Sequence, residues 1–403
     1  MSCTTEPSRA AALAQLERWL PKAKAYSYKR NFVKPGYQEV SCLSPALRHR
    51  LVTETEVANA AIAEHGFDSV EKFVQEVYWR RYWKSWLSLR PQVWTSYLDE
   101  LDHARTDDTA MARAVEIEQG QSAISIMAHF ATELVETGYL HNHARMWFAA
   151  YWIHHERLPW QLGADFFQRY LLDGDPASNT LSWRWVAGWQ TPGKTYLARK
   201  SNLEKYLHPE LIERHGEGLE LLSDPEAVSP GEIERPLITL PELPQTDVRE
   251  EYQTGLWIHE DDLNPESAAE LTETIAPSAC LVTSHRSAWH ALNYSSLRQR
   301  FIEAALKDAE SRARDHFGVP TTLVDGHDLV HALLQWANDR QLQQIIALRP
   351  EVGPLNDALP VIHESLEREG VRLCLIDRHS DLQIRPLATK GFFGFWKKLR
   401  KEF

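Results

Sequence analysis

Six polar or polarisable side chains interrupt residues 133–196, an otherwise apolar stretch that holds six of the chain's 15 tryptophans. They are Asn142, Arg145, Met146, Asp173, Asp175 and Asn179. In a helix the first three fall at positions i, i+3 and i+4 and share one face. The last three occupy a turn-rich break between two helical runs. Polar groups are costly to bury without partners, so this mixture indicates a site where they converge on one ligand.

A second group combines charge with large aromatic rings. Along residues 70–90, VEKFVQEVYWRRYWKSWLSLR, the side chains of Glu76, Trp79, Arg80 and Trp83 recur at helical spacing and share a face. Indole rings stack on nucleic-acid bases for about 1–3 kcal/mol each. A buried carboxylate can hydrogen-bond the Watson–Crick edge of an extruded base. This combination favours binding of a base over a plain hydrophobic core.

Both groups resemble motifs of the photolyase/cryptochrome family. Residues 137–146, TGYLHNHARM, resemble the family's TG-aromatic-x-HN-x-x-RM run. Residues 173–185, DGDPASNTLSWRW, resemble its DxD-x-x-(A/S)N-x-x-x-W-x-W run. Two long motifs in the family's order and spacing are a stronger signal than one short pattern. The resemblance implies an α-helical domain that binds FAD.

The resemblance implies a cofactor site built from several short segments. Residues 40–48, VSCLSPALR, resemble a family stretch whose hydroxyls and amides hold a diphosphate; taken alone, its Ser-Pro pair is an ordinary helix cap. Arg145 and Asp173 correspond to the ion pair beside the isoalloxazine ring, and Asn179 to the amide near flavin N5. The implied FAD contacts are Tyr26, Ser41, Leu43, Ser44, Phe73, Arg80, Asn142, Arg145, Asp173, Asp175 and Asn179.

A lesion pocket is also implied by the resemblance. Glu76 and Trp79 match the family's E-x-x-W-R helix that lines this pocket. Relatives that repair six-four photoproducts carry histidines where Asn142 and Met146 stand, so these residues match the type that acts on cyclobutane dimers. The implied lesion or DNA contacts are Arg30, Glu76, Trp79, Met146 and Trp185. The implied catalytic residues are Glu76, Asn142, Asn179, Trp160 and Trp183.

Two of these residues resemble an electron relay, and elsewhere the chain departs from the family. Trp160 and Trp183 match two indoles that carry an electron to the flavin, and the third stays open among Trp94, Trp147 and Trp152. Each indole taken alone is equally well a core residue. The departures are Val40, Arg81, Ala128 and Thr132, which stand where relatives often carry threonine, glutamate, aspartate and arginine.

Two shorter patterns are weaker. Residues 188–195, GWQTPGKT, satisfy the Walker A pattern but follow an indole-rich helix instead of a buried strand, which argues against an ATP site. The HHER run from His154 and the HNH run from His141 lack a second histidine at helical spacing after a glutamate. We therefore expect no metal site.

Composition is typical of a globular protein with two domains. The chain has 403 residues, 43% hydrophobic and 25% charged. No apolar run reaches the roughly 18 residues of a membrane span, and the start lacks a signal-peptide pattern, which predicts a cytoplasmic protein with no membrane partner. The cysteines have no CxxC spacing, so we expect reduced thiols and no iron–sulfur ligation. They are Cys3, Cys42, Cys280 and Cys374.

The net charge of −12 is unevenly distributed. Residues 1–200 hold 23 basic and 22 acidic side chains, whereas residues 201–403 hold 21 and 34. The first half can accept a polyanion such as DNA, and the second repels one. The acidic balance is the main objection to a DNA-binding function.

The pattern of elements predicts a division of the chain. We expect one amphipathic helix over residues 8–30, a helical FAD-binding domain over 1–205, a proline-rich linker over 206–250 and a parallel α/β domain over 251–403. Strands are expected at 255–259, 279–284, 321–325, 344–348 and 371–376. Helices are expected between them at 295–316, 330–340 and 355–369.

The second half resembles, more weakly, the family's Rossmann-like antenna domain. The resemblance rests on the opening TGLWIHEDDLNPESA and the close GFFGFWKKLRKEF. In the usual family order this domain comes first, so the resemblance implies a circular permutation. The arginines of the family's opening are replaced here, and the antenna chromophore is therefore unknown.

The predicted fold class is α+β multidomain, with an all-α FAD-binding domain followed by a Rossmann-like parallel α/β domain. The resemblance implies blue-light-driven repair, in which an electron from reduced FAD splits a cyclobutane pyrimidine dimer in single- or double-stranded DNA. The alternative is a cryptochrome-like sensor that binds FAD but signals through a partner protein. The acidic balance and the departures at Ala128 and Thr132 favour the sensor.

Overall fold

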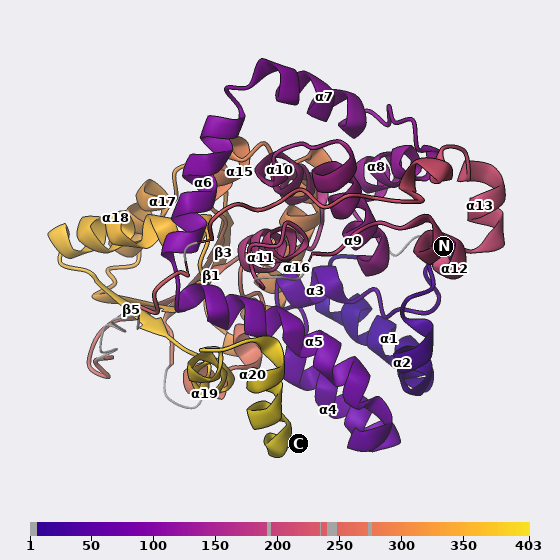
Figure 1. Cartoon of the computed structure of the whole chain (residues 1–403). Helices are drawn as coiled ribbons and strands as arrows, with labels where there is room; N and C mark the ends of the chain where they lie inside the picture. Colours follow the sequence, from indigo (N-terminus) through magenta and orange to yellow (C-terminus); the bar gives the residue numbers. More distant parts are fainter. Residues whose placement is uncertain (1–5, 192–194, 234, 240–247, 273–275) are drawn as a thin grey trace.

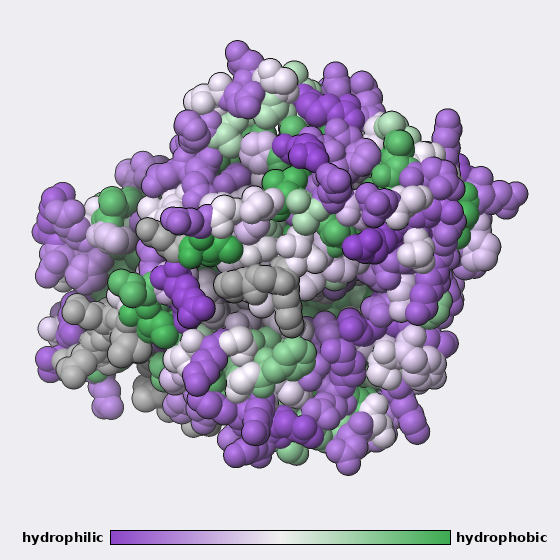
Figure 2. Space-filling model, viewed as in Figure 1, coloured by the Kyte–Doolittle hydropathy of each residue, from purple (hydrophilic) through white to green (hydrophobic). Residues whose placement is uncertain are grey.

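The computed structural model describes every residue except 1–5, 192–194, 234, 240–247 and 273–275. A helical lobe, coloured indigo to magenta in Figure 1, packs against an α/β lobe coloured orange to yellow. The predicted fold class, a helical domain followed by a parallel α/β domain, is confirmed. The face seen in Figure 2 is largely hydrophilic, with apolar residues in small separate patches.

Helices that end in well-formed caps build the first lobe. Thr53 caps α4 in a reciprocal capping box with Glu56, and Asp175 caps α11, which begins with proline. The helices are α1 Arg9–Trp19, α2 Tyr26–Lys29, α3 Ser44–Arg48, α4 Glu54–His65, α5 Phe67–Ser88, α6 Gln92–Ala104, α7 Asp108–Glu118, α8 Ser125–Thr137, α9 Asn142–Ala150, α10 Trp160–Tyr170, α11 Pro176–Val186, α12 Lys200–Tyr206 and α13 Pro209–His215.

The segment expected as one helix over residues 8–30 is divided. A 3₁₀ turn at Leu20–Ala25 separates α1 from α2. Pro21 lies at the start of this turn, and a proline has no amide hydrogen to continue the α-helical ladder. The break turns the chain, so that Tyr26 packs edge-on against Phe73 of α5, with ring centroids 5.3 Å apart.

The second lobe is a five-stranded parallel sheet with the order β3-β2-β1-β4-β5. The predicted strands and the three helical runs between them are present within one or two residues of their expected bounds. The elements are β1 Thr254–His259, α14 Ala269–Thr272, β2 Ala279–Thr283, α15 Arg286–Ala291, α16 Ser296–Phe317, β3 Thr321–Val324, α17 Leu329–Asp339, β4 Gln344–Leu348, α18 Pro354–Arg368, β5 Arg372–Ile376, α19 His379–Ile384 and α20 Phe392–Leu399.

The two faces of the sheet belong to different cores. In β1, Leu256 and Ile258 join the large core that extends through the helical lobe, whereas Trp257 packs with α17 and α18. This division follows from the alternation of side chains along a strand. Helix α16 lies between the sheet and the helical lobe, and its Arg298 donates to the carbonyl of Gly174 in the other lobe at 2.7 Å.

Ion pairs also join the lobes. Arg50 pairs with Asp262 at 3.0 Å and with Asp381 at 2.8 Å, and Arg48 pairs with Asp261 at 2.8 Å. These side chains are almost fully buried, so breaking one partner would leave a charge without compensation. The lobes are therefore tied by charge as well as by apolar packing.

The stretch expected as a linker, residues 206–250, is partly helical. It contains α13 and a 3₁₀ turn at Leu219–Leu222, and residues 240–247 lie outside the described residues. Packing of Leu211 and Leu222 into the helical lobe explains why this stretch orders.

The cysteines only partly follow the expectation of free thiols. Cys280 is a buried free thiol, and the buried Cys374 lies 3.9 Å from Gln344 Oε1, but Cys42 is disulfide-bonded, and Cys3 lies outside the described residues. Sequence spacing was a poor guide because the fold decides which cysteines approach each other. In the described parts of the chain, no helix is long and apolar enough to cross a membrane.

Candidate functional site

An ion pair between α9 and the turn before α11 forms the centre of the site. Arg145 Nη1 lies 3.0 Å from Asp173 Oδ2, and Arg145 Nε donates to the carbonyl of Leu140 at 2.7 Å. Arg80 of α5 approaches the same carboxylate oxygen at 3.6 Å. Burial would raise the pKa of Asp173, but the charges of Arg145 and Arg80 outweigh it and lower this pKa. The carboxylate is therefore ionised at neutral pH.

Asp175 performs two tasks. Its carboxylate caps α11 by accepting from the amide of Ser178 at 2.8 Å, and its other oxygen lies 3.3 Å from Lys84 Nζ and 3.6 Å from Arg48 Nε. Burial opposes ionisation, yet Lys84 and Arg48 lower the pKa of Asp175. The sequence analysis missed Lys84 and Arg48, although Lys84 lies one helical turn after Arg80.

Asn179 lies inside α11, one turn beyond its cap, and not in the turn-rich break where the sequence analysis placed it. The helix already begins at Pro176, because Asp175 as cap and Pro176 in the first turn form a strong start signal. The Asn179 side chain is buried, and its Nδ2 donates to the carbonyl of Ala164 in α10 at 2.7 Å. This bond fixes the orientation of the carboxamide.

The segment expected to hold a diphosphate lies beside the same cluster. Ser44 begins α3, and its hydroxyl contributes to lowering the pKa of Asp173. Leu43 is fully buried, and its amide donates to the Ser41 hydroxyl at 3.4 Å. Tyr26 packs against Phe73 on the facing helix α5. The fold thus brings Ser44 and Arg80 to one carboxylate, with Tyr26 and Phe73 paired nearby in the same lobe.

The residues expected to contact DNA are distributed over several elements. Glu76 pairs with Arg30 at 3.3 Å and with Lys72 at 2.8 Å. The Trp79 ring stacks on Phe392 of α20, and the Trp185 ring lies 5.6 Å from that of Tyr196. On α9, Asn142 is exposed and Met146 is half-buried, one turn apart on the same face.

Trp160 and Trp183, the two residues expected to relay an electron, belong to separate ring clusters. The ring centroids of Trp160 and Tyr97 lie 5.4 Å apart, and those of Tyr97 and Trp94 lie 5.5 Å apart. Trp183 contacts Trp152 at 6.3 Å. Gly163 of α10 lies against Trp183, because a Cβ at this position would come within 2.3 Å of the indole. Trp94 and Trp152 are thus each linked to one relay residue, whereas Trp147 stacks on His143.

The weaker patterns do not form a metal site in the described part of the chain. His141 Nδ1 accepts from the amide of His143 at 3.1 Å, and His154 accepts from the amide of Val228 at 3.1 Å. No group of three or more His, Cys, Asp or Glu among the described residues lies close enough to hold a metal ion. Part of the Walker-like run, residues 192–194, lies outside the described residues.

Several polar atoms of the cluster are buried without a hydrogen bond in the described chain, although Arg80 Nη1 lies 3.9 Å from an oxygen of Asp175. They are Arg80 Nη1, Asp173 Oδ1 and Ser178 Oγ. A buried polar atom without a hydrogen bond costs about 1–3 kcal/mol. A ligand that presents both donors and acceptors would satisfy these atoms. Fold and site together define a helical lobe suited to a polar ring cofactor, joined to a parallel α/β lobe.

Comparison with known proteins agrees with this class. Residues 73–208 match the model of the FAD binding domain of DNA photolyase. The deoxyribodipyrimidine photo-lyase of Synechococcus sp. is 30% identical over 190 residues, which are 45% of this chain and 39% of the relative. The photo-lyase of Thermus thermophilus is 31% identical over 191 residues, which are 45% and 43% of the two chains. The chain therefore spans about two fifths of the length of the curated relatives it matches.

A solved structure of a bacterial class III photolyase from Agrobacterium tumefaciens is 26% identical in sequence, with a TM-score of 0.42. The match covers 49% of this chain and 42% of the photolyase chain. Residues 73–208 are thus similar to the FAD binding domain of DNA photolyase, and this match supports FAD as the cofactor of the segment. The unpartnered donors and acceptors around Asp173 fit such a cofactor.

Proposed function

We propose that this protein is a blue-light-driven flavoprotein that splits cyclobutane pyrimidine dimers in DNA. The observation that carries the proposal is the cluster of Arg80, Arg145 and Asp173, which joins three separate elements through one buried carboxylate. All three residues were predicted from the sequence as FAD contacts. Arg80 Nη1 and Asp173 Oδ1, which form no hydrogen bond in the described chain, would provide hydrogen-bonding groups for the cofactor's polar ring.

The cluster around Asp173 would hold the FAD, which in its reduced, light-excited form would supply the electron that splits the dimer and would regain it afterwards, so that no net oxidation is needed. The protein's own groups position the reactants. Asp173 stays ionised and holds Arg145 and Arg80 in place. The side chain of Asn179 is held by the carbonyl of Ala164. Its neutral amide can hydrogen-bond flavin N5 whether this nitrogen is protonated or not.

The lesion would bind beside Glu76, Trp79 and Trp185. Extruding bases from a duplex costs a few kcal/mol, and less for a damaged pair, and stacking on indole offsets much of this cost. Arg30, paired with Glu76 at 3.3 Å, supplies a positive charge next to the pocket for a DNA phosphate. Asn142 and Met146 carry no acidic proton, in keeping with a reaction that needs only electron transfer.

Damaged DNA, single- or double-stranded, is the proposed partner. The predicted cytoplasmic location agrees with this partner in a cell whose DNA lies in the cytoplasm. The test incubates reduced protein under blue light with dimer-bearing single- and double-stranded oligonucleotides and measures dimer loss. We expect loss with the parent protein, at least tenfold slower loss with Trp185→Ala and Glu76→Gln, and normal loss with Phe393→Ala and Glu64→Gln, two exposed controls. Intact dimers on both substrates would contradict the proposal.

A light sensor is the second candidate, and one observation favours it. Phe392 already covers one face of Trp79, with ring centroids 3.6 Å apart, and Glu76 is engaged in two ion pairs. Groups that must bind a lesion are thus partly occupied by the chain itself. A protein that photoreduces FAD but leaves dimers intact in the assay above would support sensing over repair.

We also propose that the domain order is a circular permutation of the family's order. The parallel sheet order β3-β2-β1-β4-β5 and the position of the FAD-binding match before this sheet support it. Superposing residues 251–403 on the amino-terminal domain of a solved family member tests the idea. A different strand order or connection in that domain would contradict it.

A further inference from the structure

Helix α20 and the residues that flank it carry positive charge that no carboxylate neutralises. Residues 390–403 hold five basic side chains and one acidic side chain, whereas residues 201–389 hold 16 and 33. Four of the five basic residues are exposed lysines without an ion pair in the described part of the chain. These α20 lysines are Lys390, Lys397, Lys398 and Lys401. An otherwise acidic lobe therefore ends in a basic surface.

Helix α20 lies alongside α5, next to the proposed lesion pocket (Figure 1). Phe392 stacks on Trp79 with ring centroids 3.6 Å apart. Farther along the helix, Trp396 Nε1 donates to Glu71 of α5 at 3.0 Å, and Arg400 lies 3.3 Å from the same carboxylate. These contacts fix the buried side of α20 against α5, so the lysines extend into solvent from a helix that is held beside the pocket.

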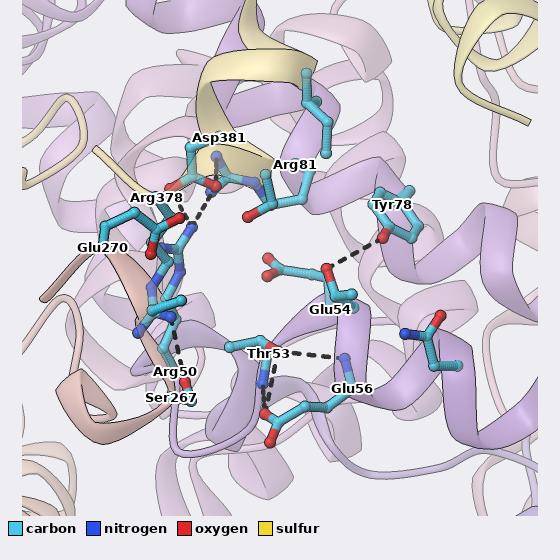
Figure 3. Close-up of a pocket in the computed structure, with 15 residues that line it drawn as sticks. Arg50, Thr53, Glu54, Glu56, Tyr78, Arg81, Ser267, Glu270, Arg378 and Asp381 are labelled. Atoms are coloured by element: carbon cyan, nitrogen blue, oxygen red, sulfur yellow. Dashed lines mark hydrogen bonds and ion pairs between the residues drawn. The ribbon is translucent and has the colours of Figure 1, made fainter. Parts of the chain in front are cut away.

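The basic residues between the lobes differ from the α20 lysines because they are paired. Around the cavity drawn in Figure 3, Arg50 and Arg81 share Asp381 at 2.8 and 2.7 Å. Arg378 pairs with Asp262 at 2.8 Å. Ion pairs of this kind leave little net charge to attract a polyanion from solvent. The ammonium groups of α20 are exposed and unpaired, so their charge is available to a partner.

The packing of α20 indicates which polyanion fits this surface. The apolar residues Phe392, Phe395, Trp396 and Leu399 are buried, which leaves Phe393 as the exposed ring of the helix. A helix that lies in a membrane surface needs an apolar face that is free to enter the lipid. DNA phosphates require only accessible positive charges, and lysine meets a phosphate as a point charge. The α20 lysines therefore fit nucleic acid better than a lipid surface.

We propose that the α20 lysines bind phosphates of the DNA strand that carries the lesion, next to the pocket that contains Trp79. This inference rests on the proposed repair function and adds a DNA contact from the α/β lobe. The net charge of −12 does not prevent such binding, because charges more than about 8 Å from a phosphate are largely screened at physiological ionic strength.

The test measures the binding of fluorescently labelled single-stranded oligonucleotides, undamaged and dimer-bearing, to the full chain in the dark over a series of salt concentrations. The variant combines Lys397→Gln, Lys398→Gln and Lys401→Gln. We expect it to bind both oligonucleotides at least tenfold more weakly than the parent at low salt. The slope of log K against log salt concentration should become shallower by about 2, because each lost phosphate contact on a single strand contributes about 0.7.

The matched control combines Arg300→Gln, Lys307→Gln and Arg340→Gln, which removes three exposed basic side chains from other elements of the α/β lobe. It changes the net charge by the same amount, and we expect it to bind DNA as the parent does. Equal weakening by the two triple variants would show that overall charge governs binding and would overturn the proposal.

Three other outcomes would overturn the proposal. The first is the absence of salt-dependent DNA binding by the parent. The second is DNA binding by the α20 variant that equals that of the parent while stability falls, which would assign the lysines to the helix dipole alone. The third is tighter binding of the parent to vesicles of phosphatidylglycerol and phosphatidylcholine than to DNA, which would assign the surface to a membrane.

Dimer loss under blue light is a separate readout, because binding is measured in the dark. Lysine-dependent binding with intact dimers would refute the proposed repair function and leave this surface standing. Dimer loss by the parent, together with undiminished DNA binding by the α20 variant, would refute only this surface.

Discussion

The indole of Trp79 and the phenyl ring of Phe392 lie face to face, with centroids 3.6 Å apart and planes 8° apart. The first residue belongs to α5 in the helical lobe and the second to α20 at the far end of the chain. Tyr82 contacts the Phe392 ring edge-on at 5.4 Å. The last helix of the α/β lobe thus supports a side chain that we assign to the lesion pocket.

Removing this support should destabilise the protein. We expect Phe392→Ala to cost about 3–5 kcal/mol, the usual range for a buried phenylalanine, because Phe392 is only 4% exposed. Phe393→Ala, next in the chain but 74% exposed, should change stability by less than about 0.5 kcal/mol. Denaturant unfolding measures both. Equal costs would show that the stack contributes nothing specific.

Breaking the central ion pair should affect both stability and cofactor content. Asp173→Asn leaves Arg145 and Arg80 without their carboxylate, and loss of one partner of a buried pair costs about 3–5 kcal/mol. We expect the purified variant to hold much less FAD per chain, measured by flavin absorbance. The matched control is Asp102→Asn, which breaks an exposed pair with Arg105 and should cost less than about 1 kcal/mol. Full flavin content in Asp173→Asn would refute the assignment.

Glu260 should make stability depend on pH. Burial, and next the negative charge of Asp261, raise its pKa to about 7. In the unfolded chain Glu260 ionises near pH 4.5, its ordinary pKa, whereas in the folded protein it ionises near pH 7. Between these two pH values the folded state holds more protons than the unfolded state. The free energy of unfolding therefore falls as pH rises through this window, by at most about 1.4 kcal/mol per pH unit.

The measurement compares the parent with Glu260→Gln, which carries no ionisable group at this position. The stability of the parent relative to the variant should decline between pH 5 and pH 7 and then level off. Taking the difference removes the contributions of buried histidines such as His49, whose lowered pKa acts in the opposite direction. Glu250→Gln, an exposed site, should leave the parent profile unchanged. A constant difference across the window would contradict the assignment.

Gly163 should not tolerate a side chain. A methyl group there would lie 2.3 Å from the Trp183 ring, so Gly163→Ala must displace the indole or α10, at about 1–3 kcal/mol. If Trp183 relays electrons to FAD, the rate of flavin photoreduction should fall together with stability. Gly391→Ala, where nothing lies within 4 Å of the added atom, is the control. A parent-like photoreduction rate in Gly163→Ala would argue against a relay role for Trp183.

The sequence by itself determined the local elements and the identity of the cofactor segment. Helical spacing placed Asn142, Arg145 and Met146 on one face, and β-rich runs bounded by breakers located the strands of the parallel sheet. These features depend on residues close together in the chain, whose periodicity and caps are directly readable. The start of α11 at Pro176 and the break at Pro21 were readable by the same rules, but competing turn signals and an uninterrupted apolar pattern led to wrong bounds.

Only the tertiary structure decided which distant residues meet. The stack of Phe392 on Trp79 and the pairing of Arg50 with Asp381 each join segments hundreds of residues apart. Nothing in a local pattern encodes such contacts, because they depend on how whole surfaces pack and on which buried charges find partners. The sequence therefore indicated which helices to expect around a ligand, whereas packing decided how the second lobe braces them.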